Sequence, residues 1–524
     1  MSVAGLFDRH IETHGTDFAI DQEERDAGPN PMSETQGVMP LRAWILMLSL
    51  VSLGFHAARA ASADPTPLDP VAVTVNTGEK PQSKVWFHAD AWWSVLCKAS
   101  GSWLLKLQGT QWTEVLSLST STNAKADVKV DGDVVHILLF EGTASQLVSA
   151  EYVTAAGTYV PWTLRPTASS LTLDSGVEVA TIDIDSQGRM WLASDGLTTI
   201  NVRHSDSPYS SWSNGYKIET GVSTDDICLV TAMPDGTVGV LWSNGSTKRF
   251  GFKTHEDGAN PKRWSEDEVP ASQSAMDGVG GGMADDHLNV AVASDGTLYA
   301  TVKTSYDTPG FPVIALLVRR PGGTWDDLYE VSQSGTRGIV FLSETSHTVT
   351  VVYKDGTSAA SDEAVVARQS PTSNISFAAT DTLKIGGFNN PSSTKQNLTD
   401  DVVVLFSSNS VAHGVFWTPG GTATAIADLT PHLGSTLSQN YPNPFNPSTT
   451  ISFEILESAH VSLQVFDAVG RLVSTLVDSD LSVGVGQVAW DGTDAGGVAV
   501  SSGVYFYRLQ AGRDAHARKM LLLK

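Results

Sequence analysis

A repeating pattern of short β-strands occupies the middle of the chain and restricts its fold more than any other feature. Apolar and polar residues alternate over short segments, and tight turns containing Gly, Asp or Ser separate these segments. A helical period is almost absent, so the pattern predicts an all-β protein. The repeating units begin near Lys84, Ala126, Val179, Asp225, Asp286, Thr336 and Asp400.

The spacing of these units predicts a seven-bladed β-propeller over residues 64–432. The units recur at intervals of roughly 40 to 65 residues, which is near the period of propeller blades with loop insertions. A further strand within Pro70–Thr77 precedes the first unit, and we expect it to supply the outer strand of the last blade and close the ring. Six blades plus a stray hairpin, or a long two-sheet sandwich, are alternatives that the pattern leaves open.

Charge and cysteine content exclude several classes of partner. The 524 residues include 57 acidic and 33 basic side chains, a net charge of −24. Nucleic-acid binding and polybasic attachment to a membrane surface both need a basic face, so neither is expected. Two cysteines, Cys97 and Cys228, are too few for a disulfide framework or a four-thiolate zinc site. We favour two separate buried thiols over a single bridge between them.

The first 63 residues have the pattern of a targeting sequence rather than of a folded domain. Residues 43–55 form an uninterrupted apolar run that follows Arg42 and precedes small residues fitting a cleavage site. The run is too short to span a bilayer, so we interpret residues 39–63 as a signal peptide, with a buried core helix as the alternative. Residues 1–38 are polar and acidic and are predicted to be a mis-assigned or disordered leader, with Met39 as the true start. The mature chain would then have no membrane span.

Charged residues recur where the repeating units begin. In a propeller these positions open the innermost strands, so the side chains should converge at one mouth of the central channel. Convergent carboxylates with a His and an Arg suit a cation such as Ca²⁺, or general acid–base work on a glycan. The competing interpretation is that Asp simply forms turns there and solvates a polar mouth. The candidate catalytic residues are Asp286 and His287, and the candidate binding residues are Asp127, Asp226, Arg337 and Asp401.

No metal ligand set or cofactor motif stands out beyond these residues. The chain lacks a G-x-S-x-G elbow, an H-E-x-x-H motif and a phosphate-binding G-x-x-x-x-G-K-[ST] loop. The sequence therefore predicts no cofactor.

The last part of the chain predicts a second, smaller β domain. Apolar residues alternate in 461–465 and 504–506, as expected for a small antiparallel β-sandwich of the Ig-like type over residues 450–524. Three prolines lie in residues 433–449, which we interpret as an extended linker before the first strand.

A set of motifs in this domain carries a specific resemblance. They are the segment Tyr441, Pro442, Asn443, Pro444, Phe445, Asn446, Pro447, the turn residues Gly470 and Arg471, and the strand-associated Trp490, Gly503 and Tyr505. In these motifs the domain resembles the C-terminal sorting domain of bacterial type IX secretion cargo, and also the Ig-like module of flagellar hook-capping proteins. The resemblance implies export by the type IX secretion machinery, followed by release or attachment at the outer cell surface. An ordinary Ig-like domain without a sorting role is the alternative.

The resemblance of the central region is confined to single hairpins. Asp185–Ser194 is similar to the hairpin of sensor-type propeller repeats and to the Asp-box of sialidase-like propellers, although Ser186 stands where the box has Asp. The preferred function is a non-catalytic propeller that binds a glycan or protein ligand at the channel mouth. A carbohydrate-active hydrolase or lyase of sialidase-like architecture is the first alternative, and a structural surface protein is the second.

Overall fold

The computed structural model describes residues 64–78, 81–356, 363–397, 401–408, 410–419, 435–455, 458–467, 470–511 and 514–523. Within these ranges the chain consists of β-strands and loops, apart from one turn of 3₁₀-helix, η1 (Thr154–Ala156). None of its helices is long and apolar enough to cross a membrane, as far as the described residues go. The leader and signal-peptide predictions, residues 1–38 and 39–63, lie outside these ranges.

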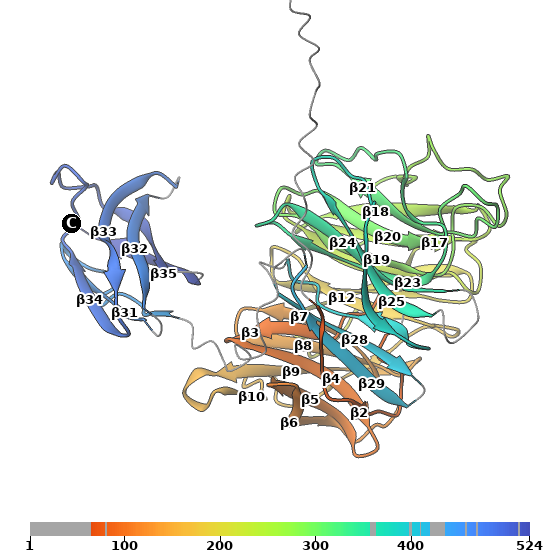
Figure 1. Ribbon diagram of the computed structural model, residues 1–524, viewed down its shortest axis with the longest axis horizontal. Helices are drawn as coiled ribbons and strands as arrows, with labels where there is room; N and C mark the ends of the chain where they lie inside the picture. Colours follow the sequence, from red (N-terminus) through yellow and green to blue (C-terminus); the bar gives the residue numbers. More distant parts are fainter. Residues whose placement is uncertain are drawn as a thin grey trace, which may run out of the picture. The chain divides into compact units, whose positions relative to one another are not determined.

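Between Thr66 and Trp417 the described residues form seven antiparallel sheets that follow one another along the chain (Figure 1). Sheet I contains β3 (Val85–His88), β4 (Ala91–Lys98), β5 (Gly101–Gln108) and β6 (Gln111–Ser119). Sheet II contains β7 (Lys125–Asp131), β8 (Val134–Phe140), β9 (Ala144–Val153), β10 (Thr158–Pro161) and β11 (Ser169–Thr172). Sheet III contains β12 (Ala180–Ile184), β13 (Arg189–Asp195), β14 (Thr199–Asp206) and β15 (Tyr216–Thr220). Sheet IV contains β16 (Cys228–Met233), β17 (Thr237–Asn244) and β18 (Arg249–Glu256).

The remaining three sheets complete the ring. Sheet V contains β19 (Leu288–Val292), β20 (Leu298–Lys303), β21 (Ile314–Arg319) and β22 (Tyr329–Ser332). Sheet VI contains β23 (Thr336–Ser343), β24 (Thr348–Asp355), β25 (Ala364–Pro371) and β26 (Thr380–Ile385). Sheet VII contains β27 (Asn389–Ser392), β28 (Val402–Ser408) and β29 (Val411–Trp417), together with β1 (Thr66–Pro67) and β2 (Val71–Ala72). The all-β propeller predicted from the sequence is confirmed.

Strands from the beginning of the described chain close the ring. Both β1 and β2 pair antiparallel with β29, with Thr66 opposite Phe416 and Val71 opposite Ala412. The strand expected within Pro70–Thr77 therefore does complete the last sheet. Because these hydrogen bonds join segments more than 300 residues apart, they hold the first and last parts of the propeller together.

One predicted boundary was wrong. The first six units begin within a few residues of the first strands of sheets I to VI, but sheet VII begins with β27, before the predicted start near Asp400. Asp401 consequently precedes β28, the second strand of its sheet, and does not open an innermost strand. The strand β27 contains Pro391 and polar residues only, so it lacks the apolar alternation by which the other first strands were found.

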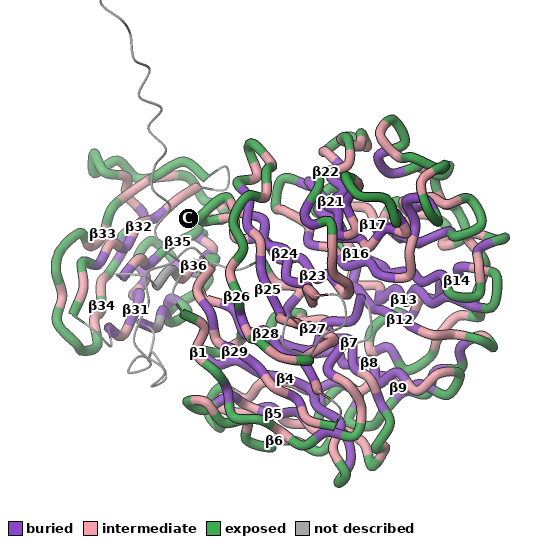
Figure 2. The backbone as a smooth tube through the Cα atoms, turned by 45° about the vertical axis from the view of Figure 1, so that its right-hand side comes forward, coloured by how far each residue is buried: buried purple, intermediate pink, exposed green. Residues whose placement is uncertain are grey.

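Apolar layers between neighbouring sheets form the core. Trp93 of sheet I packs with Val135 and Ile137 of sheet II, and Trp191 of sheet III packs with Trp242 of sheet IV. Figure 2 shows the buried residues concentrated along the strands and the exposed ones at the turns. Both faces of each sheet are covered, as expected for stacked blades.

The cysteines lie in different sheets. Cys97 is on β4 and Cys228 on β16, and both are buried free thiols. This agrees with the prediction of two separate thiols. Burial raises the pKa of the Cys228 thiol well above its usual value, so it is kept in the neutral form.

The second domain is the predicted β-sandwich. One sheet contains β30 (Thr436–Leu437), β31 (Thr449–Ile455) and β34 (Gly484–Trp490). The other contains β32 (Ala459–Asp467), β33 (Leu472–Leu481), β35 (Gly503–Ala511) and β36 (Asp514–Leu522). Their facing side chains, among them Ile451, Leu463 and Tyr507, form one buried cluster.

The proline-containing segment from residue 436 onward is part of this sandwich, so the linker predicted over residues 433–449 is wrong for that part of its range. Leu437 pairs with Phe453, and Phe445 is 2% exposed against Trp490, with ring centroids 5.7 Å apart. Backbone hydrogen bonds join Phe445 to Leu521 and Leu523. The prolines prevent regular strand pairing, but the aromatic ring between them still enters the core.

The packing of Phe445 gives a stability prediction. Phe445→Ala should lower the free energy of unfolding of the sandwich by about 3–5 kcal/mol, because it leaves a cavity against Trp490. Phe506→Ala is the matched control, since that ring is 40% exposed and its removal should cost less. Hydrogen exchange of β31 and β35 in the full chain measures both. Equal protection in the two variants would contradict the assignment of Phe445 to the core.

Candidate ligand-binding site in the central channel

In sheets II, III and V, side chains of the first strand form hydrogen bonds to the first strand of the next sheet. The backbone N–H of Val230 donates to Oγ1 of Thr181 at 2.9 Å, and that of Ala232 donates to Oδ2 of Asp183 at 2.9 Å. Because the residue numbers on β12 and β16 increase together in these pairs, the two strands run in the same direction. Asn289 of sheet V likewise accepts a hydrogen bond from the N–H of Val340 in sheet VI, at 3.0 Å.

The segment Pro81–Lys84, which we call the channel segment, crosses the channel before it joins β3. The carbonyl oxygen of Pro81 accepts a hydrogen bond from Nδ2 of Asn289 in sheet V, at 3.2 Å. Gln82 donates through Nε2 to the carbonyl oxygen of Ala180 in sheet III, at 3.0 Å.

Two further hydrogen bonds fix the channel segment on its other side. The N–H of Ser83 donates to Oδ1 of Asp127 in sheet II at 3.0 Å, and Oγ of Ser392 in sheet VII donates to the carbonyl oxygen of Gln82 at 3.3 Å. Hydrogen bonds to four sheets therefore anchor a few residues near the axis.

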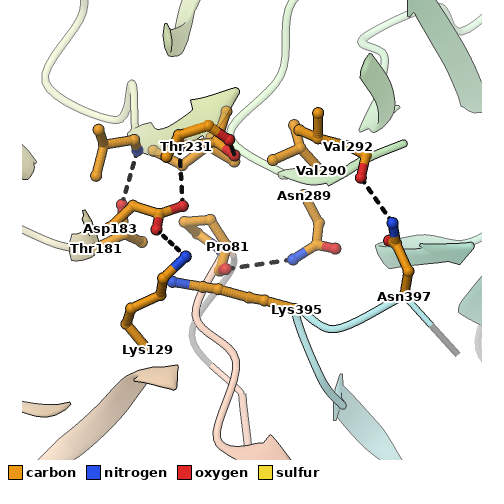
Figure 3. A pocket seen from close by; sticks show the side chains of 13 residues that line it. Pro81, Lys129, Thr181, Asp183, Thr231, Asn289, Val290, Val292, Lys395 and Asn397 are labelled. Carbon is orange, nitrogen blue, oxygen red and sulfur yellow. Dashed lines mark hydrogen bonds and ion pairs between the residues drawn. The ribbon is translucent and has the colours of Figure 1, made fainter. Parts of the chain in front are cut away.

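Two cavities share the side chains of Lys129 and Lys395, and the channel residue Pro81 lines the first of them. Figure 3 shows this first cavity. Cavity 1 has a volume of about 200 Å³ and cavity 2 of about 350 Å³. Cavity 1 is lined by Pro81, Lys129, Thr181, Asp183, Leu229, Val230, Thr231, Ala232, Asn289, Val290, Val292, Lys395 and Asn397. Cavity 2 is lined by Val85, Trp86, His88, Val128, Lys129, Val130, Gly132, Thr394, Lys395 and Gln396.

Each lysine in these cavities has a buried carboxylate as its partner. Nζ of Lys395 lies 2.6 Å from Oδ2 of Asp127, and Nζ of Lys129 lies 2.5 Å from Oδ1 of Asp183. Lys395 also donates to the carbonyl oxygen of Ile182 at 3.0 Å. In Figure 3 the two ammonium groups lie close to each other, next to Asp183 and Pro81.

Burial and charge act against each other on these carboxylates. Burial raises the pKa of Asp127 above its usual value, although Lys395 and the N–H donors of Ser83 and Ile182 oppose this. Burial also disfavours the ionised form of Asp183, but there the ammonium groups of Lys129 and Lys395 prevail and hold the pKa below its usual value. The ionised Asp183 in turn outweighs the effect of burial on Lys129 and raises the pKa of that ammonium group.

Most residues predicted from the unit starts lie at the other end of the first strands. Asp226 precedes β16 and the Asp286–His287 pair precedes β19, whereas cavity 1 involves the later residues Ala232 and Val292 of those strands. Of the six predicted residues, none lines either cavity. Asp127 contacts Lys395 through Oδ2, and Asp226, Asp286, His287 and Asp401 have contacts elsewhere in the described residues.

Those contacts are of the kind that fix turns and strand starts. Asp226 accepts hydrogen bonds from the N–H groups of Ser223 and Gly245, and Asp401 accepts one from Oγ1 of Thr418 at 2.6 Å. Arg337 has a φ of 58° at the irregularity near the start of β23.

The Asp286–His287 pair belongs to a small charged cluster. Nδ1 of His287 lies 2.5 Å from Oδ1 of Asp286 and 3.3 Å from Oδ1 of Asp285. Candidate ligand atoms of the three residues lie within 4.8 Å of one another, a spacing that a cation would need. However, Nζ of Lys303 lies 2.9 Å from Oδ2 of Asp285, so a lysine already supplies the positive charge there. The cluster therefore fits an ion pair better than a metal site.

The cavity residues Lys129, Asp183, Asn289 and Lys395 were missed in the sequence. Asp127 and Lys129 are two residues apart on β7 and therefore lie on the same face of the strand. Two charged residues on one face of a buried strand could have indicated the site in the sequence. Lys395 follows β27 in a loop, and nothing in its local sequence marks it.

The C-terminal motif residues divide into core and surface. Phe445 and Trp490 are buried, and the ring of Tyr505 lies 5.3 Å from that of Trp490. Gly470 forms a turn with a φ of 80°, where a side chain would be strained. Tyr441 is 82% exposed and is the motif ring that the described residues leave on the surface.

Comparison with known proteins identifies the second domain more clearly than the first. Residues 439–515 match the family model for the FlgD Ig-like domain. No curated protein matches the chain. The family match covers only the sandwich, so it assigns no family to the propeller.

Solved structures similar to the chain are distant. PorZ, a surface component of the type IX secretion system of Porphyromonas gingivalis, is 15% identical over 85% of this chain and 60% of its own, with a TM-score of 0.38. The chain thus spans about three fifths of the length of PorZ. The polysaccharide lyase Uly1 is 8% identical over 64% of this chain and 90% of its own, with a TM-score of 0.39. The Dos1 propeller is 6% identical over 66% of this chain and 80% of its own, with a TM-score of 0.40.

The buried carboxyl group of Asp195, which accepts hydrogen bonds from the residues just before β12, predicts how stability depends on pH. It accepts hydrogen bonds from the N–H groups of Glu178 and Val179, and burial raises its pKa to about 6. The folded state then binds a proton more readily than the unfolded state, so its stability falls as pH rises from about 4 to about 6. Relative to Asp195→Asn, the wild type should lose up to about 3 kcal/mol across this range.

Urea unfolding at a series of pH values measures this difference. Asp235→Asn, at an exposed turn of sheet IV, is the control and should unfold with the pH dependence of the wild type. Parallel curves for the wild type and Asp195→Asn would contradict the prediction.

Proposed function

We propose that the chain is a bacterial secreted or cell-surface β-propeller protein that binds a ligand in cavities 1 and 2 without catalysing its reaction. The observation that carries the proposal is a cavity lined by charged and polar side chains from several sheets and bounded by the channel segment. Propeller ligands commonly bind at a channel mouth, and concave sites with a few convergent polar groups are the usual binding sites of proteins. The ligand class that best fits such a site is a glycan, with a protein partner as the alternative.

The carboxylates near the cavities favour binding over hydrolysis or elimination. A general acid or base must exchange a proton with the substrate. Asp127 is wholly buried behind Lys395, and Asp183 already accepts hydrogen bonds from Ala232 and Ile184. The Asp286–His287 pair lies outside both cavities. These contacts support a structural role for the carboxylates and favour binding over the hydrolase or lyase alternative.

The sandwich supports export by the type IX secretion machinery. The Tyr441–Pro447 segment is built into the domain rather than preceding it, and the sandwich matches the FlgD Ig-like family. With the predicted signal peptide over residues 39–63, this gives a route across both membranes. Localisation at the cell surface or in the medium is part of the same proposal.

A variant at Tyr441 tests the sorting role separately from folding. Tyr441→Ala should leave thermal unfolding unchanged, because the ring is exposed, and should lower the exported fraction several-fold in a host with a type IX system. Val485→Ala is the matched control, since Val485 is also exposed and lies outside the motif. Export is measured by immunodetection in medium and surface fractions. Full export of a chain that ends at residue 434 would overturn the sorting proposal.

A variant at the rim tests the binding role. Asn397, an exposed residue that lines cavity 1, donates through Nδ2 to the carbonyl oxygen of Val292. Asn397→Trp should cover the cavity and abolish binding detected for the wild type on a glycan array. Gln187→Trp, at an exposed turn of sheet III, should leave binding unchanged. Binding that survives Asn397→Trp would place the ligand elsewhere.

A further inference from the structure

The cavities have hydrogen-bond donors left over. An ammonium group carries three N–H donors. Within the described residues, Lys129 uses one of them on Asp183, and Lys395 uses two on Asp127 and Ile182. Both side chains line both cavities, so the remaining donors are close to the space that a ligand would take.

The strongest acceptors in the wall are already engaged. Oδ1 of Asp183 accepts from Lys129 and from the N–H of Ile184, and Oδ2 accepts from the N–H of Ala232. Oδ1 of Asn289 accepts from the N–H of Val340. A ligand group that complements this wall must therefore bring acceptor oxygens.

Glu344, a carboxylate that contacts the cavity residue Asn397, is also engaged. Glu344 accepts hydrogen bonds from the N–H and Oγ of Ser294 and from Nδ2 of Asn397. It competes little for the two lysines, which keep Asp127 and Asp183 as their partners. In a chain with a net charge of −24, the two ammonium groups balance the charge of Asp127 and Asp183 and still have N–H donors to offer an anionic group of a ligand.

We propose that cavities 1 and 2 bind the end of an acidic glycan, with a sugar carboxylate placed between Nζ of Lys129 and Nζ of Lys395. This inference rests on the proposed binding function and names its ligand class. Charge-assisted hydrogen bonds to a carboxylate use the spare N–H donors of both lysines. The channel segment bounds cavity 1 at Pro81, so a terminal sugar fits better than the middle of a long chain.

The backbone around cavity 1 disfavours an extended peptide as the ligand. Peptides that add to a sheet need free backbone groups along a strand edge. In β16 the N–H groups of Val230 and Ala232 are bonded to Thr181 and Asp183. A sugar does not need such an edge, because its hydroxyl groups can bond to side chains such as Thr231 and Asn397.

A pair of ligands tests the proposal on the unaltered chain. Oligosaccharides that end in glucuronic acid and the same oligosaccharides with the carboxyl reduced to the neutral alcohol are titrated calorimetrically against the full protein. The acidic form should bind at least about tenfold more tightly, because charged hydrogen bonds are worth more than neutral ones. The difference should shrink as salt is raised.

A matched pair of variants locates the effect. Lys129→Gln should weaken binding of the acidic ligand about tenfold and binding of the neutral ligand by a smaller factor, because only the acidic ligand loses a charge-assisted hydrogen bond. Lys98→Gln is the control, since Lys98 also pairs with a carboxylate, Glu114, outside the cavities. Circular dichroism verifies that both variants fold. If Lys129→Gln does not fold, the comparison of the acidic and neutral ligands on the wild type still tests the proposal.

The outcomes separate this inference from the binding function itself. Equal binding of acidic and neutral glycans, both blocked by Asn397→Trp, would overturn the acidic ligand and leave the binding function standing. Tighter binding of a sulfated sugar, or of a peptide with a free terminal carboxylate, would overturn the carboxylate sugar as the ligand. No binding of any of these by the wild type would count against both proposals.

Discussion

The propeller depends on satisfying the inner edges of its first strands. In a ring of sheets, the first strand of each sheet has no further strand on its channel side, yet its buried N–H groups need partners. Thr181, Asp183 and Asn289 supply them from neighbouring sheets, and the channel segment adds hydrogen bonds to sheets II, III, V and VII. Apolar packing and the side-chain hydrogen bonds of Thr181, Asp183 and Asn289 hold neighbouring sheets together, whereas the channel segment joins sheets that are not neighbours.

The need to pair the N–H groups of the first strands also explains why charged side chains lie near the channel. Carboxylates placed at the axis to accept backbone N–H groups need nearby cations, because an unpaired buried charge is costly. Lys129 and Lys395 meet that need, and because each ammonium group has more N–H donors than its partners use, unused donors remain at the cavities. A structural solution thus produces the feature that we propose binds a ligand. The charged cluster around His287, in which Lys303 pairs with Asp285, lies outside both cavities.

In the sandwich, the residues of the C-terminal motif fall into a buried group and an exposed group. Phe445 and Trp490 stabilise the domain by packing together, so their presence in the motif reflects folding as much as recognition. Tyr441 is exposed beside them and contributes little to the core. In the sorting role that we propose, recognition by a partner would depend on the surface residues of the segment, while the buried ones fix its conformation.

Strand alternation and turn residues are local properties. From them the sequence by itself determined the all-β propeller, the start of the first strand in six of its seven sheets, the closing strand within Pro70–Thr77 and the sandwich. It failed at β27, whose polar residues carry no alternation, and at Phe445, whose prolines concealed a core position. Only the tertiary structure decided which charges meet: Lys395 lies 268 residues from Asp127 in the chain and contacts it across the ring. Local pattern specifies each sheet, but distances across a channel depend on how all the sheets close around it.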